Sequence, residues 1–181
     1  MFMKKSSACV IIVLILILGI SSFILIREQS SINQYAQCML NGTQTQGTIG
    51  FLDLGTSDKV LIENIGQPEL KSEEVIWVSD GLEHQTWKYE NKGIELGMIR
   101  NKEEQQVWSI KITSPCNYKT REDIGIGSTR REVINKYKDR INEEHSFGNQ
   151  DIVVLGSIYN GTIFHFERDK VDSIFIGAAA E

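Results

Sequence analysis

The sequence has no excess of basic residues: among its 181 residues are 19 Lys and Arg but 24 Asp and Glu, for a net charge of −5. The acidic excess is larger beyond residue 26, because Lys4 and Lys5 are the only charged residues before Arg27. Proteins that bind nucleic acid or anionic lipid need a basic surface. The composition therefore argues against both as partners.

Proline and cysteine are scarce too, with two and three residues respectively. Few prolines, moderate charge and many Ile and Val are typical of a folded body and not of a disordered chain. Beyond residue 26 the only cysteines are Cys38 and Cys116. In an oxidising compartment they form a disulfide if the fold brings them close enough, and otherwise they are two free thiols. The sequence leaves both alternatives open.

Motifs for catalysis, metals and cofactors are missing as well. Gly125-Ile-Gly127 precedes a predicted helix but lacks the spacing and the lysine of a phosphate-binding loop. The histidines, His84, His145 and His165, fall in separate predicted elements without paired ligand spacing. No Ser or Cys lies in a nucleophile elbow. The sequence therefore predicts no enzyme, no cofactor and no metal site.

One long hydrophobic run stands at the N-terminus, where Cys9 to Ile26 are free of charge. As a helix these residues extend about 27 Å, close to the roughly 30 Å hydrocarbon core of a bilayer. Lys4 and Lys5 precede the run, and positive flanks stay in the cytoplasm. The pattern predicts a single-pass membrane anchor over 9–26, with residues 1–8 cytoplasmic and residues 27–181 extracytoplasmic.

Two alternatives to an anchor remain. A cleaved secretory signal has a small-x-small site after its apolar core, which Gly19-Ile-Ser21 supplies, although Phe23 to Ile26 continue the run past that cut. Lipid attachment at Cys9 fits less well, because the apolar stretch follows this cysteine. Beyond the anchor, residues 27–50 are rich in Gln, Ser, Thr and Asn, the composition of a stalk or linker.

The body contains an internal similarity. Residues 52–66 align with residues 124–138 without a gap, so that Ser57 falls on Thr129, each placed to cap a helix. Thr129 and Glu132 also fit a capping box. The apolar spacing predicts amphipathic helices over 57–65 and 129–141. Downstream, Val-x-Ser-Ile-x-Ile occurs at both 107–112 and 171–176.

Strands are predicted after each helix by alternation of apolar residues. They cover 93–102 and 107–112 in the first copy and 161–170 and 171–176 in the second, with a further short strand at 75–78. Asn160-Gly161 predicts a two-residue hairpin turn. Period two places Trp108, Ile110 and Ile112 on one face, and the three tryptophans, Trp77, Trp87 and Trp108, are expected in the core.

These elements predict an α+β fold: an N-terminal transmembrane helix, then two helix-plus-antiparallel-meander repeats over 51–114 and 115–181. The repeats would form one sheet with both helices on one face. A short strand, glycine, capped helix and meander ending in Val-x-Ser-Ile-x-Ile resembles the BamE-like (SmpA/OmlA) and β-lactamase-inhibitor-like superfamily. Its members are small extracytoplasmic bacterial domains that bind other proteins, so the resemblance implies a binding role without catalysis.

The sheet face away from the helices is expected to be the binding surface. It would present apolar and charged side chains together, as recognition surfaces do. The residues predicted there are Glu95, Ile99, Lys111, Ile163, His165 and Phe175, with Val107 and Val171 beside them. The function expected is a membrane-anchored, non-enzymatic module that recognises a protein or a cell-envelope component. The alternative is a small-ligand or metal sensor using His165 with Glu95.

Overall fold

The computed structural model describes residues 48–101, 103–146 and 151–179. Their elements, in chain order, are α2 (Asp58–Ile65), β1 (Leu70–Lys71), β2 (Val75–Ile76), β3 (Glu83–Tyr89), the 3-10 helix η2 (Glu90–Lys92), β4 (Ile94–Asn101), β5 (Glu104–Thr113), α3 (Arg130–Tyr137), α4 (Glu143–Ser146), β6 (Ile152–Ser157), β7 (Asn160–Glu167) and β8 (Lys170–Gly177).

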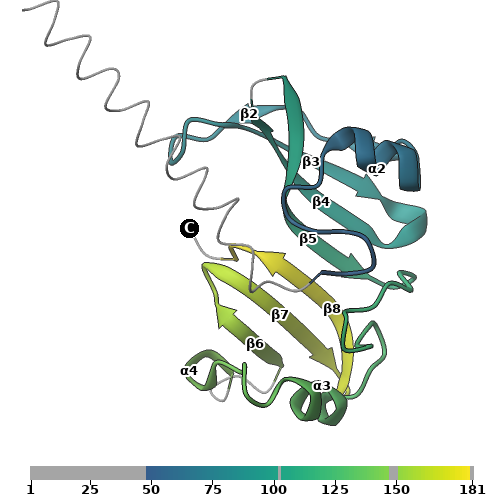
Figure 1. Ribbon diagram of the computed structural model, residues 1–181, viewed down its shortest axis with the longest axis vertical. Helices are drawn as coiled ribbons and strands as arrows, with labels where there is room; N and C mark the ends of the chain where they lie inside the picture. Colours follow the sequence, from purple (N-terminus) through teal and green to yellow (C-terminus); the bar gives the residue numbers. More distant parts are fainter. Residues whose placement is uncertain (1–47, 102, 147–150, 180–181) are drawn as a thin grey trace, which may run out of the picture. The chain divides into compact units, whose positions relative to one another are not determined.

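All eight strands belong to one sheet, in which every neighbouring pair is antiparallel (Figure 1). Its order is β1-β3-β4-β5-β8-β7-β6, and β2 also pairs with β3. The centre of the sheet joins strands far apart in the chain, because β5 pairs with β8. Leu61 of α2 and Val133 of α3 are fully buried in the same hydrophobic core cluster.

The predicted fold class, a transmembrane helix followed by two equivalent repeats, is wrong. The structure has a single continuous sheet and does not divide into two copies. β1 and β2 extend only the β3 edge, whereas the four-residue helix α4 lies beside β6, at the other edge. Ile49, placed in the stalk by composition, is a fully buried core residue. Local similarity of sequence therefore does not produce two matching halves.

The expected transmembrane anchor and the localisation derived from it are not borne out either. No helix in residues 48–101, 103–146 and 151–179 is long and apolar enough to cross a membrane. The longest, α2 and α3, have eight residues each, about 12 Å of helix against a roughly 30 Å hydrocarbon core. The segment 9–26 itself lies outside the described residues.

Helix capping follows the sequence closely. The Ser57 side chain accepts a hydrogen bond from Val60 N at the start of α2. Thr129 and Glu132 form the predicted capping box of α3, with the Glu132 carboxylate accepting from Thr129 N at 2.7 Å. Caps depend on residues three apart, so sequence alone suffices to find them. The helix nevertheless ends at Tyr137, four residues before the predicted Ile141.

Two β-bulges overturn the predicted side-chain faces. Met98 pairs with Val107 while Gly97 pairs with Ser109, so Trp108 is an extra residue in β5. The bulge places the Val107 side chain in the core. The backbone N–H of Val107 donates to Thr56 O, just before α2, at 2.9 Å. A second irregularity between His165 and Phe166 likewise places Val171 in the core. A bulge adds one residue to one strand, which breaks the period of two.

The predicted hairpin turn at Asn160-Gly161 is also wrong. Ser157 pairs with Asn160 and Gly156 with Gly161, so the turn consists of residues 158 and 159. A positive φ, +78°, occurs at Gly156, which lies within β6 and not in the turn itself. Gly161 instead lies inside β7, between Gly156 on β6 and Gly177 on β8.

Two buried tyrosines predict a loss of stability at alkaline pH. Burial, and then the charge of Glu69, raises the pKa of Tyr89 to about 12, and burial also raises the pKa of Tyr137. Their protons are held more tightly in the folded than in the unfolded state, so the free energy of unfolding falls as the pH rises from about 10 to about 12. Urea titrations across this range should show the fall, and Tyr89→Phe should reduce it.

Tyr159, which is 62% exposed, is the control for that substitution. Tyr159→Phe removes no buried hydroxyl and should leave the pH dependence as in the parent. An equally steep fall in the parent and in Tyr89→Phe would contradict the assignment.

Candidate functional site

A row of directly paired side chains crosses the sheet on the face away from the core. In strand order from β3 to β6 the row consists of Lys88, Glu95, Lys111, Phe175, Ile163 and Val154. Four residues of the predicted binding face therefore lie next to one another. Glu95 forms an ion pair with Lys88 at 3.1 Å. Lys111 is exposed and forms no ion pair with any described residue.

Accessibility divides the predicted face. Glu95, Lys111 and Phe175 are partly or fully exposed, whereas Ile99 and Ile163 are 4% and 6% exposed and so offer little surface. His165 is exposed and pairs with Ser173, off the row. Loss of solvation at its ring, and then the charge of Lys111, lower the pKa of His165. The accessible part of the predicted face thus consists of Glu95, Lys111 and Phe175 on β4, β5 and β8, with His165 on β7.

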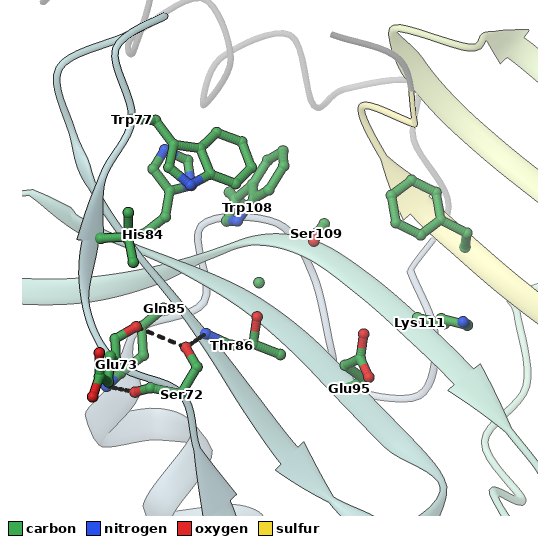
Figure 2. Close-up of a pocket in the computed structure, with 13 residues that line it drawn as sticks. Ser72, Glu73, Trp77, His84, Gln85, Thr86, Glu95, Trp108, Ser109 and Lys111 are labelled. Atoms are coloured by element: carbon green, nitrogen blue, oxygen red, sulfur yellow. Dashed lines mark hydrogen bonds between the residues drawn. The ribbon is translucent and has the colours of Figure 1, made fainter.

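The neighbouring row on the same face has small side chains. Thr86, Gly97 and Ser109 pair across β3, β4 and β5. A Cβ atom on Gly97 would overlap Ser109 Oγ and Trp108 Nε1, so only glycine leaves the indole in its place. This row of small residues forms the floor of a groove of about 320 Å³ (Figure 2). Glu95, Lys111 and Phe175 line one side of the groove.

Three rings line the groove on the other side, and we call Trp77, His84 and Trp108 the aromatic corner (Figure 2). The rings of Trp77 and His84 are stacked, with centroids 3.7 Å apart and planes 5° apart. Trp108 stands nearly perpendicular to both, at 5.3 Å from Trp77 and 5.2 Å from His84. His84 covers one face of Trp77, and the Trp77 side chain as a whole is still partly exposed at the groove.

The turn between β2 and β3 fixes the aromatic corner. Trp77 N–H donates to Leu82 O at 3.0 Å, and Trp77 O accepts from Gly81 N at 2.8 Å. Asp80 accepts from Leu82 N at 2.9 Å with one carboxylate oxygen. Its other oxygen lies 2.8 Å from His84 Nε2. One short turn therefore holds the indole, the carboxylate and the imidazole together.

Several polar atoms at the groove have no partner among the described residues. The hydroxyls of Thr86 and Ser109 and the carboxylate of Glu73 form no hydrogen bond or ion pair there, and His84 Nδ1 is buried without a partner. His84 is only 6% exposed. Buried polar atoms normally have hydrogen-bond partners. The groove is therefore a surface with unused hydrogen-bonding capacity.

A metal site built from His165 and Glu95 does not fit this arrangement. These residues lie on β7 and β4, with β5 and β8 between them. Three strand spacings amount to about 14 Å, too far for one metal ion to be shared. The three histidines are also separated, on β3, α4 and β7. No group of three potential ligands converges within residues 48–101, 103–146 and 151–179.

The predicted disulfide is left untested. Cys116 is buried, with 8% of its surface exposed, and forms no disulfide with a described residue. Burial raises the pKa of its thiol. Cys38 lies outside the described residues. The pairing of the two therefore stays a prediction.

Sequence reasoning missed the aromatic corner. Trp87 is in the core as expected, at 1% exposure, but Trp77 and Trp108 are partly exposed at the groove. Trp108 was misplaced because the bulge in β5 is invisible to a period of two. The alternation of residues in β3 held a signal for part of the site, because it places His84 and Thr86 on the sheet face opposite to that of the core residue Trp87.

Comparison with known proteins adds no further information. No family model, no curated protein and no solved structure matches the chain.

Proposed function

We propose that the chain is a non-enzymatic binding module that holds its ligand in the groove across β3, β4 and β5. The observation behind this proposal is the combination of accessible indole rings with unpaired polar groups in one concavity. Ligand sites are typically concave and largely apolar, with a few placed polar groups. Of the binding face predicted from the sequence, the proposal therefore keeps only the part that lines the groove, which consists of Glu95, Lys111 and Phe175.

The polar groups support binding more than catalysis. Nucleophilic catalysis needs a hydroxyl or thiol within hydrogen-bond reach of a base. In the part of the chain that the structure describes, neither the Ser109 nor the Thr86 hydroxyl is bonded to a histidine or a carboxylate. The imidazole of His84 is instead stacked on Trp77 and bonded to Asp80.

The floor of the groove determines how a ligand is held. β3, β4 and β5 are interior strands, each with a paired strand on both sides. Their backbone groups are engaged in the sheet, so a ligand in the groove gains little by adding a strand, as peptides do at exposed edges. It is therefore held by side chains.

Titration of the full chain with soluble peptides and oligosaccharides, followed by tryptophan fluorescence, tests the proposal. A ligand of the groove should change the emission of Trp77 and Trp108 and leave that of the buried Trp87 unchanged. Lys111→Ala should weaken binding about tenfold, a loss of roughly 1.4 kcal/mol. The matched control is Lys170→Ala at the far end of β8, which should bind as the parent does.

The proposal fails if ligands of both classes bind equally well to the Lys111→Ala and Lys170→Ala proteins. It fails too if a bound ligand is recovered as a chemically changed product, because the chain would then be an enzyme.

A further inference from the structure

The groove has the chemistry of a carbohydrate site, and we propose that it binds a neutral sugar ring of an oligosaccharide. The inference rests on the proposed function, because it takes the groove as the ligand site. A pyranose ring has one face of C–H groups and a rim of hydroxyls. The ring would lie with its apolar face against an indole of the aromatic corner and its hydroxyls toward the floor.

The aromatic corner provides the platform for an apolar ring face. Trp77 and Trp108 lie at 81° to one another, so that they form two walls of a corner and not a parallel clamp. A flat aromatic ligand would prefer a clamp or a slot, whereas a puckered ring with C–H groups on one face needs a single indole face. Indoles bring large apolar area with little loss of side-chain freedom on binding.

The floor provides partners for hydroxyl groups. Thr86 and Ser109 each have a hydroxyl that donates one hydrogen bond and accepts others, and neither is used within the described residues. Sugar hydroxyls have the same dual capacity. An apolar ligand would cover these groups without bonding them, and an uncompensated buried hydroxyl is costly.

The charges at the groove favour a neutral ligand. The carboxylate of Glu73 would repel an anionic ligand, and the ammonium of Lys111 would repel a cationic one. Glu95 is paired with Lys88 and so adds little net charge. Lys111 and Glu73 can still form hydrogen bonds with neutral hydroxyls, since the ammonium donates and the carboxylate accepts.

The size of the groove suits one ring. Its volume of about 320 Å³ is at the lower end of the range for small-molecule sites. The remaining rings of an oligosaccharide would extend into solvent past the exposed rim residues Ser72, Glu73 and Lys111. A peptide is the competing occupant, and it would lack partners for its backbone over these interior strands.

Chitotriose, cellotriose and maltotriose are the probes, titrated separately into the full chain to millimolar concentration. At least one should give a saturable change in tryptophan emission and matching heat by calorimetry. Sorbitol, which has the hydroxyls but no ring face, should give neither. Trp108→Ala should weaken binding at least about tenfold and Ser109→Ala by about three- to tenfold. Tyr159→Ala removes an exposed aromatic ring outside the groove and should bind as the parent does.

Trp108→Phe keeps a ring at the bulge, and it should retain part of the affinity if Trp108→Ala proves poorly folded by circular dichroism. Failure of all three trisaccharides to bind, or sorbitol binding as well as they do, overturns the sugar assignment. If a peptide then binds in a Lys111-dependent manner, the binding module stands with a different ligand. If neither peptides nor sugars show binding that depends on Lys111, the proposed function is wrong as well.

Discussion

Leu61→Asp is expected to abolish cooperative folding of the body. Leu61 is the buried residue of α2, with an exposed fraction of 0%, and it belongs to the core cluster under the sheet. Aspartate at this position would place a carboxylate without a partner in an apolar interior, which costs several kcal/mol even after the carboxylate takes up a proton. Val133→Asp on α3 should have the same effect, because Val133 is equally buried.

Urea denaturation followed by far-ultraviolet circular dichroism measures the effect. The control is Arg131→Asp, which lies on the exposed side of α3 and should change the free energy of unfolding by about 0.5 kcal/mol. Lys59 is a poorer control, because it is paired with Glu104 at 2.5 Å. A Leu61→Asp protein that unfolds as cooperatively as the parent would contradict the packing of α2 on the sheet.

Gly161→Val is expected to destabilise the sheet strongly by steric overlap alone, because Gly161 has no positive φ. Gly161 is buried in β7, and a Cβ atom there would overlap the backbone oxygens of Leu155 and Ser157 in β6. Backbone atoms in a sheet cannot rotate aside as a side chain can, so strands β6 and β7 would have to separate. The overpacking should cost about 3 kcal/mol or more of unfolding free energy.

Gly127→Ala is the comparison for that change. Gly127 has φ +86° but open space around its Cβ position. Alanine there should therefore lower the free energy of unfolding by only about 1 to 2 kcal/mol, the cost of an L residue at positive φ. Denaturation midpoints of the two variants would separate steric overlap from backbone strain. A Gly161→Val protein more stable than Gly127→Ala would show that the pairing of Gly156 with Gly161 is wrong.

How much of this structure is predictable from sequence depends on the distance over which each feature is determined. The caps at Ser57 and Thr129 involve residues three apart, and sequence found both. The strands β4, β5, β7 and β8 lie within a few residues of their predicted ranges, because apolar alternation is also local.

The faces of those strands were less predictable. The bulge at Trp108 exists only in the pairing of β5 with β4, and its effect is to exchange Val107 and Trp108 between core and groove. The candidate site was affected most, since Glu95, Lys111 and Phe175 were foreseen but the aromatic corner was not. The pairing of β5 with β8 at the centre of the sheet joins residues at least 60 positions apart, and no local pattern determines its register.

The bulge in β5 also ties the groove to helix α2. The backbone of Val107 accepts from Gly55 N at 2.7 Å and donates to Thr56 O, just before the cap of α2, while the next side chain, Trp108, lines the groove. Lifting α2 off the sheet must therefore break the bonds that position Trp108. In native-state hydrogen exchange, the amides of α2 and of Val107 should open as one cooperative unit with a common free energy. A ligand in the groove would slow exchange in a helix that it never touches.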